Sequence, residues 1–309
     1  MPLRSITGAT VRIACAFLAL ALAGGLAACG SSAASQPGNQ ARTPAEAAAA
    51  TQLPTFEIDA GDGMRYTLPK RTAPSGSVMV TLVNRDEDMA HQAQLFRLHD
   101  GVTMKQFTEE LLSPGGIGAV LPLSDPSGGP DAVGPGHKAS VVTVLAPSAT
   151  YAVICSVPGK DGTPHYMHGM VTSFTTAATE GKATPPDVAS TITMRHMRYQ
   201  VPASVDWSKP IEVANKSTDD PHEMQVLGPA PGKTLKDVQH YLMAPPGSAP
   251  AAPPPYRAYG GVAALAPGGH QIVTLHLPAG HYVLLCFVVD PKTHMPHFAM
   301  GMLTPITVS

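Results

Sequence analysis

The sequence is poor in aromatic side chains and carries no excess of positive charge. Aromatic residues make up 5% of the 309 residues, and Trp207 is the single tryptophan. The hydrophobic cores must therefore be built mainly from aliphatic side chains and methionine. Lys and Arg together number 20 against 22 Asp and Glu. Because this balance would not attract a phosphate backbone, we expect no nucleic-acid partner.

The chain also lacks the short motifs of several large enzyme classes. It contains no Gly-x-Ser-x-Gly nucleophile elbow, no His-Glu-x-x-His zinc motif and no complete Gly-x-x-x-x-Gly-Lys-Ser/Thr phosphate loop. These absences argue against a hydrolase or a nucleotide-binding enzyme. Proline is abundant by contrast, with 32 residues beside 29 glycines. This composition favours many turns and short strands over long helices.

The N-terminal segment has the features of a secretion signal. Arg4 and Arg12 supply positive charge, and the apolar run from 13 to 23 is shorter than the roughly 20 residues that a spanning helix needs. The sequence Leu26-Ala27-Ala28-Cys29 follows and resembles the lipobox of bacterial lipoproteins, in which cleavage precedes a cysteine that is then lipidated. An ordinary cleavage site with an incidental cysteine is the alternative.

The lipobox resemblance implies a protein that crosses the cytoplasmic membrane and is anchored on its extracytoplasmic face. On this interpretation residues 1–28 are a lipoprotein signal peptide, and Cys29 carries the lipid that attaches the protein to the membrane. Residues 29–52 are rich in Ala, Ser, Pro, Gly and Gln. Because this composition buries too little apolar surface to fold, we expect a flexible tether there.

The second half of the chain repeats the first. Ten pairs of identical residues are 131 positions apart: Asn84 and Asn215, His91 and His222, Gly101 and Gly232, Thr103 and Thr234, Lys105 and Lys236, Leu111 and Leu242, Thr143 and Thr274, Pro147 and Pro278, Tyr151 and Tyr282, and Cys155 and Cys286. The offset is 132 for His165 and His297. A nearly constant offset over this length indicates a tandem duplication. It predicts a first domain at 53–177, a linker at 178–188 and a second domain at 189–309.

Within each copy the hydrophobic residues mostly alternate, as is typical of strands. One segment per copy instead has apolar residues at helical spacing behind a threonine that can cap a helix, which predicts short helices over Thr103–Leu112 and Thr234–Met243. Short strands with one helix per copy predict an all-β fold of two tandem Greek-key β-sandwiches. The turn-rich stretches after the helices, residues 113–136 and 244–261, are expected to be surface loops.

Each copy contains the same four metal-binding residue types in the same order. The predicted ligands are His91, Cys155, His165 and Met170 in the first copy and His222, Cys286, His297 and Met302 in the second. A thiolate, two imidazoles and a thioether suit copper, because sulfur favours Cu(I) and imidazole binds both oxidation states. Zinc sites do not use a thioether, and calcium and magnesium take oxygen ligands.

This arrangement resembles the cupredoxin family, the blue-copper domains of the plastocyanin and azurin type. In that family the upstream histidine follows a strand end that carries an asparagine, here Asn84, and the other ligands lie on the loop between the last two strands. The second copy also resembles secreted bacterial cupredoxin-like proteins through Pro221-His222-Glu223 and Cys286-Phe287. The resemblance implies a cupredoxin-like fold in each half and one copper per domain. The spacing between the cysteine and the second histidine is longer here than in well-known blue-copper proteins.

We therefore expect a copper-binding protein that transfers electrons or holds and delivers the ion, with a redox or copper-handling protein as its partner. We expect no enzymatic activity. Copper oxidases that resemble tandem cupredoxins need His-x-His pairs and a histidine beside the cysteine, and this sequence has neither. A metal-free cupredoxin-fold lipoprotein that acts as an envelope binding or interaction module is the alternative.

Two cysteines remain once the signal segment and Cys29 are set aside. In an oxidising compartment Cys155 and Cys286 would ordinarily suggest one disulfide. Equivalent positions of two copies could approach closely enough only at a pseudo-twofold axis between them. We therefore expect two free thiols, with the disulfide as the competing use of these residues.

Overall fold

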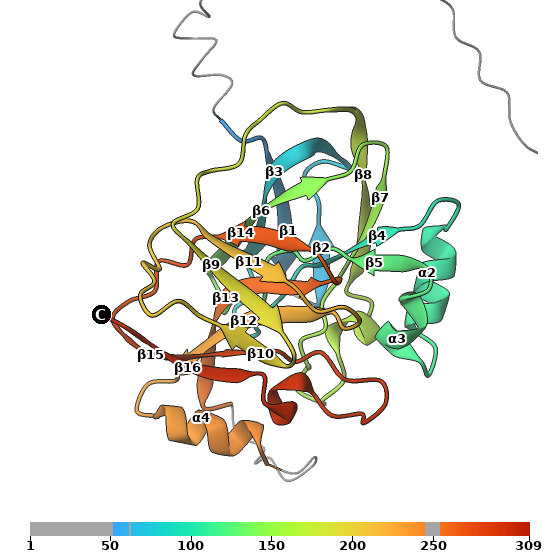
Figure 1. Cartoon of the computed structure of the whole chain (residues 1–309). Helices are drawn as coiled ribbons and strands as arrows, with labels where there is room; N and C mark the ends of the chain where they lie inside the picture. The colour runs from blue at the N-terminus through green and yellow to red at the C-terminus, as the bar shows by residue number, and fades with distance from the viewer. Residues whose placement is uncertain (1–51, 62, 245–253) are drawn as a thin grey trace, which may run out of the picture. The chain divides into compact units, whose positions relative to one another are not determined.

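The computed structural model describes residues 52–61, 63–244 and 254–309 (Figure 1). The predicted signal peptide at 1–28, the lipidated Cys29 and nearly all of the predicted tether lie outside the described residues. In the part of the chain that is described, no helix is both long enough and apolar enough to cross a membrane. Both copies of the repeat belong to one compact unit.

The first half folds as a sandwich of two sheets, which alternate buried and less buried residues as expected from their sequence pattern. One sheet has the order β2-β1-β3-β6 and the other β5-β4-β7-β8. The strands are β1 (Thr55–Gly61), β2 (Arg65–Thr67), β3 (Thr72–Asn84), β4 (Gln94–Leu98), β5 (Ser124–Pro126), β6 (Lys138–Leu145), β7 (Thr150–Ile154) and β8 (Val171–Glu180).

The second half repeats this arrangement strand for strand. Its sheets have the orders β10-β9-β11-β14 and β13-β12-β15-β16. The strands are β9 (Ser190–Arg195), β10 (Arg198–Gln200), β11 (Ile211–Asn215), β12 (His222–Pro229), β13 (Tyr256–Leu265), β14 (His270–Val273), β15 (Gly280–Leu285) and β16 (Leu303–Val308). The predicted all-β class, with two sandwiches, is confirmed.

The predicted short helix of each copy is present as well. Helices α2 (Met104–Leu111) and α4 (Leu235–Leu242) begin after Thr103 and Thr234, and each threonine side chain accepts a hydrogen bond from the third residue of its helix in a capping box. In Figure 1 α2 lies beside β4 and β5, while α4 contacts β12 and β15. The first half also has α3 (Gly116–Val120), and each half has one short 3-10 turn, η1 (His165–His168) or η2 (His297–Met300).

The two halves are joined through both of their layers. Strand β14 pairs with β6, so that the sheets containing them become neighbours in one continuous sheet. In the other layer, residues 127–133, which we call the crossing segment, pair with β13 through bridges between Ser127 and Leu265, Pro130 and Val262, and Val133 and Tyr259. Residues 181–189, between β8 and β9, connect the two halves along the chain, while the sheet joins them in space.

The crossing segment and β13 are related by a pseudo-twofold axis. Gly128 N–H donates to Ala264 O at 2.9 Å, and Gly260 N–H donates to Ala132 O at 2.9 Å. Gly260 and Ala264 lie 132 residues after Gly128 and Ala132 and are their counterparts in the repeat. Each half thus gives the other the same contacts that it receives, as in an isologous dimer interface.

The expectation of surface loops after the helices is wrong for the segments at this axis. Within 113–136, Ser124, Asp131 and Val133 are buried, and within 244–261 the residues from Tyr256 onward belong to β13. The buried side chains of Gln94 and Gln225 complete hydrogen bonds of the backbone at this axis. Gln225 Nε2 donates to Ala132 O at 3.1 Å, and Gln94 Nε2 donates to Ala264 O at 3.0 Å. Turn-rich composition therefore marks irregular backbone here, which is buried because side chains and strand pairing complete its hydrogen bonds.

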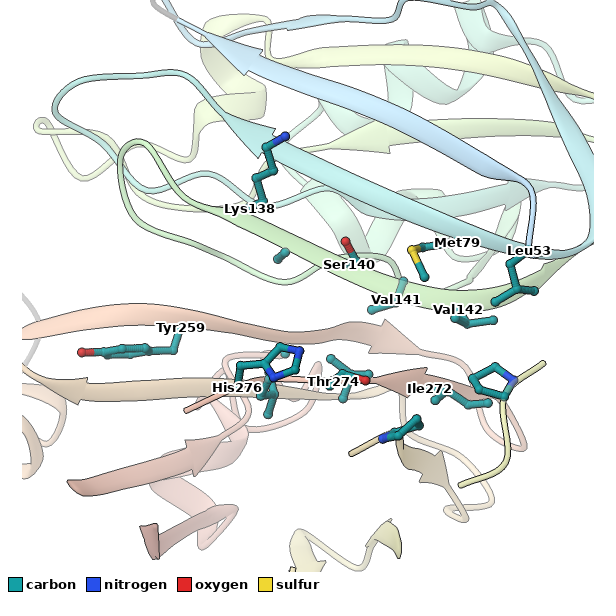
Figure 2. Close-up of a pocket in the computed structure, with 16 residues that line it drawn as sticks. Leu53, Met79, Lys138, Ser140, Val141, Val142, Tyr259, Ile272, Thr274 and His276 are labelled. Atoms are coloured by element: carbon teal, nitrogen blue, oxygen red, sulfur yellow. The ribbon is translucent and has the colours of Figure 1, made fainter. Parts of the chain in front are cut away.

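A cavity of about 580 Å³ lies where the two halves meet beside β6 and β14. Figure 2 shows Lys138, Ser140 and Val141 on its upper wall and Thr274 and His276 on its lower wall. None of the eight predicted metal ligands lines this cavity. The candidate site therefore has to be sought inside each sandwich.

Candidate metal centres

Three ligand-type side chains of the first half meet at one buried point. His91, Cys155 and His165 each offer one ligand atom, and these atoms all lie within 4.8 Å of one another. The two histidine Nδ1 atoms are 3.2 Å apart, and Cys155 Sγ lies 3.4 Å from Nδ1 of His165 and 3.9 Å from Nδ1 of His91. All three residues are 0% exposed. The structure therefore brings together the two imidazoles and the thiol of the predicted first site.

The second half builds the same cluster from the equivalent residues. His222, Cys286 and His297 also offer ligand atoms within 4.8 Å of one another. The Nδ1 atoms of the two histidines are 3.0 Å apart, and Cys286 Sγ lies 3.5 Å from Nδ1 of His297. These residues are 0–1% exposed. The duplication of sequence is therefore also a duplication of site geometry.

The long spacing between cysteine and second histidine is absorbed by a closed loop. In the first half Pro158 bridges to Pro164, and His165 N–H donates to Val157 O at 3.0 Å. The following residue, Tyr166, donates its N–H to Cys155 O at 2.9 Å. The second half closes its loop in the same way, by a bridge between Val289 and Pro296. The extra residues therefore leave the cysteine and histidine side by side.

The two predicted methionine ligands lie next to these clusters. Met170 is 0% exposed, accepts at its backbone O from Cys155 N–H at 3.3 Å and donates its N–H to His165 O at 3.0 Å. Met302 is also 0% exposed and makes the equivalent bonds with Cys286 and His297, at 3.2 and 2.9 Å. The backbone of each methionine is thus hydrogen-bonded to the backbone of the cysteine and of the second histidine of its cluster.

A carboxylate orients the first histidine of the first half. His91 Nε2 lies 3.2 Å from Asp86 Oδ2, and both residues are buried. Burial works against ionisation of Asp86, but N–H bonds from Asp88 and Met89 and the contact with His91 lower its pKa. A carboxylate at Nε2 holds the proton there and leaves the Nδ1 lone pair facing the cluster, which is the usual arrangement behind a metal-bound imidazole.

Each thiol is held by a backbone N–H from the residue after the first histidine. Gln92 N–H donates to Cys155 Sγ at 3.4 Å, and Glu223 N–H donates to Cys286 Sγ at 3.4 Å. Burial raises the pKa of Cys155 to about 12 and raises that of Cys286 well above its ordinary value. In the metal-free protein both cysteines are therefore protonated and free, and a bound cation has to displace the proton. The alternative of a disulfide is not realised.

Several residues that support the clusters are not among the predicted ligands. The hydroxyl of Tyr66 donates to Gln92 O, and the hydroxyl of Tyr199 donates to Glu223 O at 2.6 Å. Asp131, on the crossing segment, accepts from Gln92 Nε2 at 2.7 Å. The constant offset relates Gln92 to Glu223 and could have indicated that pair. Asp131 lies at the pseudo-twofold axis, and its counterpart in the second half is not acidic. The repeat therefore gave no indication that Asp131 would support the clusters.

Other histidines near these loops stay outside the clusters. His168 Nε2 lies 3.1 Å from Asp161 Oδ2 at the surface, and His294 is exposed. The candidate ligand set thus consists of the predicted imidazoles and thiols, with the two methionines alongside them.

The donor atoms fit a copper ion in each half. An ion bonded to two imidazole nitrogens at about 2.0 Å and one sulfur at about 2.3 Å, with the three donors spread evenly around it, would hold the nitrogens about 3.5 Å apart and each nitrogen about 3.7 Å from the sulfur. The observed separations in the two clusters run from 3.0 to 3.9 Å, which spans these values. The two imidazoles and the thiol of each half would hold a copper ion, because copper accepts nitrogen and soft sulfur donors, and a thioether lies on the neighbouring backbone.

The buried histidines predict that the metal-free protein is labile to acid. Burial, then the charge of His91, lowers the pKa of His165 to about 4, and burial, then the charge of His297, lowers that of His222 to about 4. Because the unfolded chain takes up these protons near pH 6.5, the folded state loses stability as the pH falls from about 6.5 to about 4. Each histidine accounts for about 3 kcal/mol of this loss.

Urea unfolding of the metal-free protein between pH 7 and pH 4 measures this effect. His222→Gln should reduce the loss of unfolding free energy between pH 7 and pH 4 by the contribution of one histidine, about 3 kcal/mol. His294→Gln, which changes an exposed imidazole, should leave the curve as in the unchanged protein. Equal slopes for all three proteins would contradict the prediction.

Asp131 predicts the opposite pH dependence. Burial raises the pKa of Asp131 to about 7, although hydrogen bonds from Ala132 N–H and from Gln92 act to lower it. Among the described residues, Asp131 Oδ2 has no hydrogen-bond partner. A carboxyl whose folded pKa is raised stabilises the protein below its unfolded pKa near 4, and this contribution is lost as the pH rises to about 7. Asp131→Asn should therefore raise the free energy of unfolding at pH 8 by about 4 kcal/mol. At pH 4 the same substitution should bring no gain, and a gain of equal size at both pH values would contradict this account.

No protein-family model matches the chain, and no curated protein matches its sequence. Among solved structures it is similar to the dithionite-reduced auracyanin of Roseiflexus castenholzii, with 23% identity and a TM-score of 0.28 over 40% of this chain and 96% of that one. It is similar to auracyanin A of Chloroflexus aurantiacus, described as a blue copper protein, with 18% identity and a TM-score of 0.28 over 40% of this chain and 99% of that one. It is also similar to a multicopper oxidase, with 15% identity and a TM-score of 0.23 over 84% of this chain and 90% of that one. At these identities and scores the function has to be argued from the chain's own residues.

Proposed function

We propose that this chain is a cupredoxin-like copper protein that carries single electrons on the extracytoplasmic face of a membrane. The observation that supports this most directly is the pair of buried clusters, each with two imidazole Nδ1 atoms and one thiol facing a common point. When bound there, copper supplies one-electron chemistry between Cu(I) and Cu(II).

The protein's own residues favour electron transfer over catalysis. The histidines and cysteines of both clusters are at most 1% exposed, so a substrate has no direct path to an open ligand position. Backbone hydrogen bonds from Gln92 and Glu223 hold the two sulfurs in place. A donor set fixed in this way needs little rearrangement between oxidation states, which is what a carrier of electrons requires. The same enclosure supports the expectation that the protein is not an enzyme.

The proposed location follows from the N-terminal sequence. A signal segment at 1–28 and a lipid on Cys29 would attach the protein to the outer face of the cytoplasmic membrane, with residues up to 52 as a tether. Its partner in this compartment would be a redox or copper-handling protein. Labelling with a fatty acid should mark the protein, and Cys29→Ala should abolish the label and release the protein from membranes.

Copper titration of the chain from residue 30 onward tests the function. Two copper ions per chain, with a strong visible thiolate-to-copper band and reversible one-electron reduction, are the expected result. Copper that binds only as colourless Cu(I) and passes to a chelator would replace electron transfer by holding and delivery. A protein that binds no copper would instead be a metal-free envelope interaction module, and the proposal would be wrong.

A further inference from the structure

The first cluster is supported by a side chain from the contact between the two halves. Gln92, whose backbone N–H donates to Cys155 Sγ at 3.4 Å, also donates its side-chain Nε2 to Asp131 Oδ1 at 2.7 Å. Asp131 belongs to the crossing segment, and both residues are buried. A residue of the crossing segment thus reaches the residue that holds the sulfur of the first cluster.

Asp131 fixes the orientation of the Gln92 amide. Gln92 Oε1 accepts from Ser156 Oγ at 2.6 Å and from Ser156 N–H at 3.4 Å, and Ser156 directly follows Cys155. In a turned amide, Nε2 would face the Ser156 N–H donor and Oε1 would face the oxygen of Asp131 that now accepts. Only the observed orientation satisfies both partners. With Asp131 in place, the Gln92 side chain therefore fastens the residue after His91 to the residue after Cys155.

The second half holds Asp131 in position. Asp131 N–H donates to Gly261 O at 3.3 Å, and Asp131 Oδ1 accepts from Ala132 N–H at 2.7 Å. Ala132 N–H also donates to Gln225 Oε1 at 2.9 Å, and Ala132 O accepts from Gly260 N–H at 2.9 Å. Contacts with β12 and β13 thus set the place of the carboxyl group that orients the amide.

This support has no equivalent at the corresponding position of the second half. The counterpart of Asp131, 132 positions later, is Ala263, whose methyl side chain cannot accept a hydrogen bond. Glu223 occupies the position of Gln92, and its own Oε1 accepts from the N–H of Phe287, the residue after the second cysteine. The first centre therefore receives a contact from the crossing segment that the second centre does not receive from β13.

We propose that Asp131 is a positioning residue through which the second half sets the copper affinity and the reduction potential of the first centre. The proposal rests on the proposed function, because it concerns the copper bound there. Asp131 acts through Gln92: while the amide is held, the Gln92 N–H stays directed at the Cys155 sulfur. An N–H at that sulfur favours the more negative, Cu(I) state of the centre, so weakening it lowers the reduction potential.

Asp131→Ala, made in a Cys286→Ser protein that retains only the first centre, tests the proposal. Copper affinity should fall about 10-fold, and the reduction potential should fall with it. Asp131→Leu, which also lacks an acceptor but fills the space, should behave in the same way. Asp131→Asn should keep both values close to those of the unchanged residue, because the asparagine Oδ1 can still accept from Gln92 Nε2. If the asparagine variant shifts as far as the alanine and leucine variants, charge rather than positioning is responsible and the proposal is wrong.

Two controls separate action through Gln92 from a general effect. In a Cys155→Ser protein, which retains only the second centre, Asp131→Ala and Asp131→Asn should give the same affinity and potential as each other. In a protein that already carries Gln92→Ala, Asp131→Ala should bring no further change at the first centre. A further 10-fold loss of affinity there would overturn the proposed route through Gln92.

A readout without copper follows hydrogen exchange of the Gln92 side-chain amide in the metal-free protein. The amide should be protected in the unchanged protein and in Asp131→Asn, and it should exchange faster in Asp131→Ala and Asp131→Leu. Protection that survives the alanine and leucine substitutions would overturn the positioning role alone. A Cys286→Ser protein that keeps Asp131 and binds no copper would instead overturn the proposed function.

Discussion

Replacement of Cys286 by serine is expected to remove one copper centre and leave the other intact. Copper stoichiometry should fall from two ions per chain to one, and the thiolate-to-copper band should fall by about half. The sulfur is the only soft anionic donor of its cluster and lies 3.5 Å from His297 Nδ1. A hydroxyl in its place binds copper far more weakly, so affinity at this centre should drop at least about 100-fold. Titration followed by visible absorption provides the measurement.

Matched variants make this result specific. Cys155→Ser should remove the first centre in the same way, and the double variant should bind no copper tightly. Met167→Leu and His294→Ala change exposed side chains on the same two loops and should leave stoichiometry and band unchanged. If Cys286→Ser retains two copper ions with the full band, the assignment of the thiolate is wrong.

Alanine at Gly261 is expected to destabilise the folded protein by more than about 4 kcal/mol. Gly261 lies at φ +138°, a region that side chains rarely adopt, and an added Cβ would lie 1.9 Å from Met224 O. This clash falls where β13 pairs with β12 and faces the crossing segment. Gly129, its counterpart in the first half, has φ +115° and would place a Cβ 2.1 Å from Ala93 O. Gly129→Ala should therefore have an effect of similar size.

Urea unfolding of each variant gives the comparison. Gly268→Ala is the control, since Gly268 also has a positive φ of +81° but its Cβ would meet nothing within 4 Å. This control should cost about 1 kcal/mol from backbone strain alone. A Gly261→Ala protein no less stable than Gly268→Ala would show that the close approach at the axis does not limit folding.

Most of the ligand set could be predicted because it depends on local order and on the repeat. His222, Cys286 and His297 stand 131 or 132 positions after His91, Cys155 and His165, and a constant offset is visible without any structure. The helices behind Thr103 and Thr234 were predictable for a similar reason, because a capping box is formed by residues three apart. These signals are short in range or repeated, so sequence alone carries them.

The turn-rich segments could not be placed in the same way. Ser127 pairs with Leu265 and Val133 with Tyr259, and no local pattern specifies partners so distant along the chain. Their irregular backbone was predicted to lie at the surface. Gln94 and Gln225 allow it to be buried by supplying hydrogen bonds from strands β4 and β12, which only the packed structure brings within reach.

By itself, the sequence determined that this protein is a duplicated all-β chain with one His-Cys-His set per copy, because periodicity, caps and repeated order are properties of the chain. The tertiary structure decided that the Nδ1 atoms face the thiols, that closed loops bring His165 and His297 back to their cysteines, and that Gln92 reaches Asp131 on the crossing segment. These features depend on contacts between residues far apart in sequence, whose geometry arises only when the two sandwiches pack around a common axis.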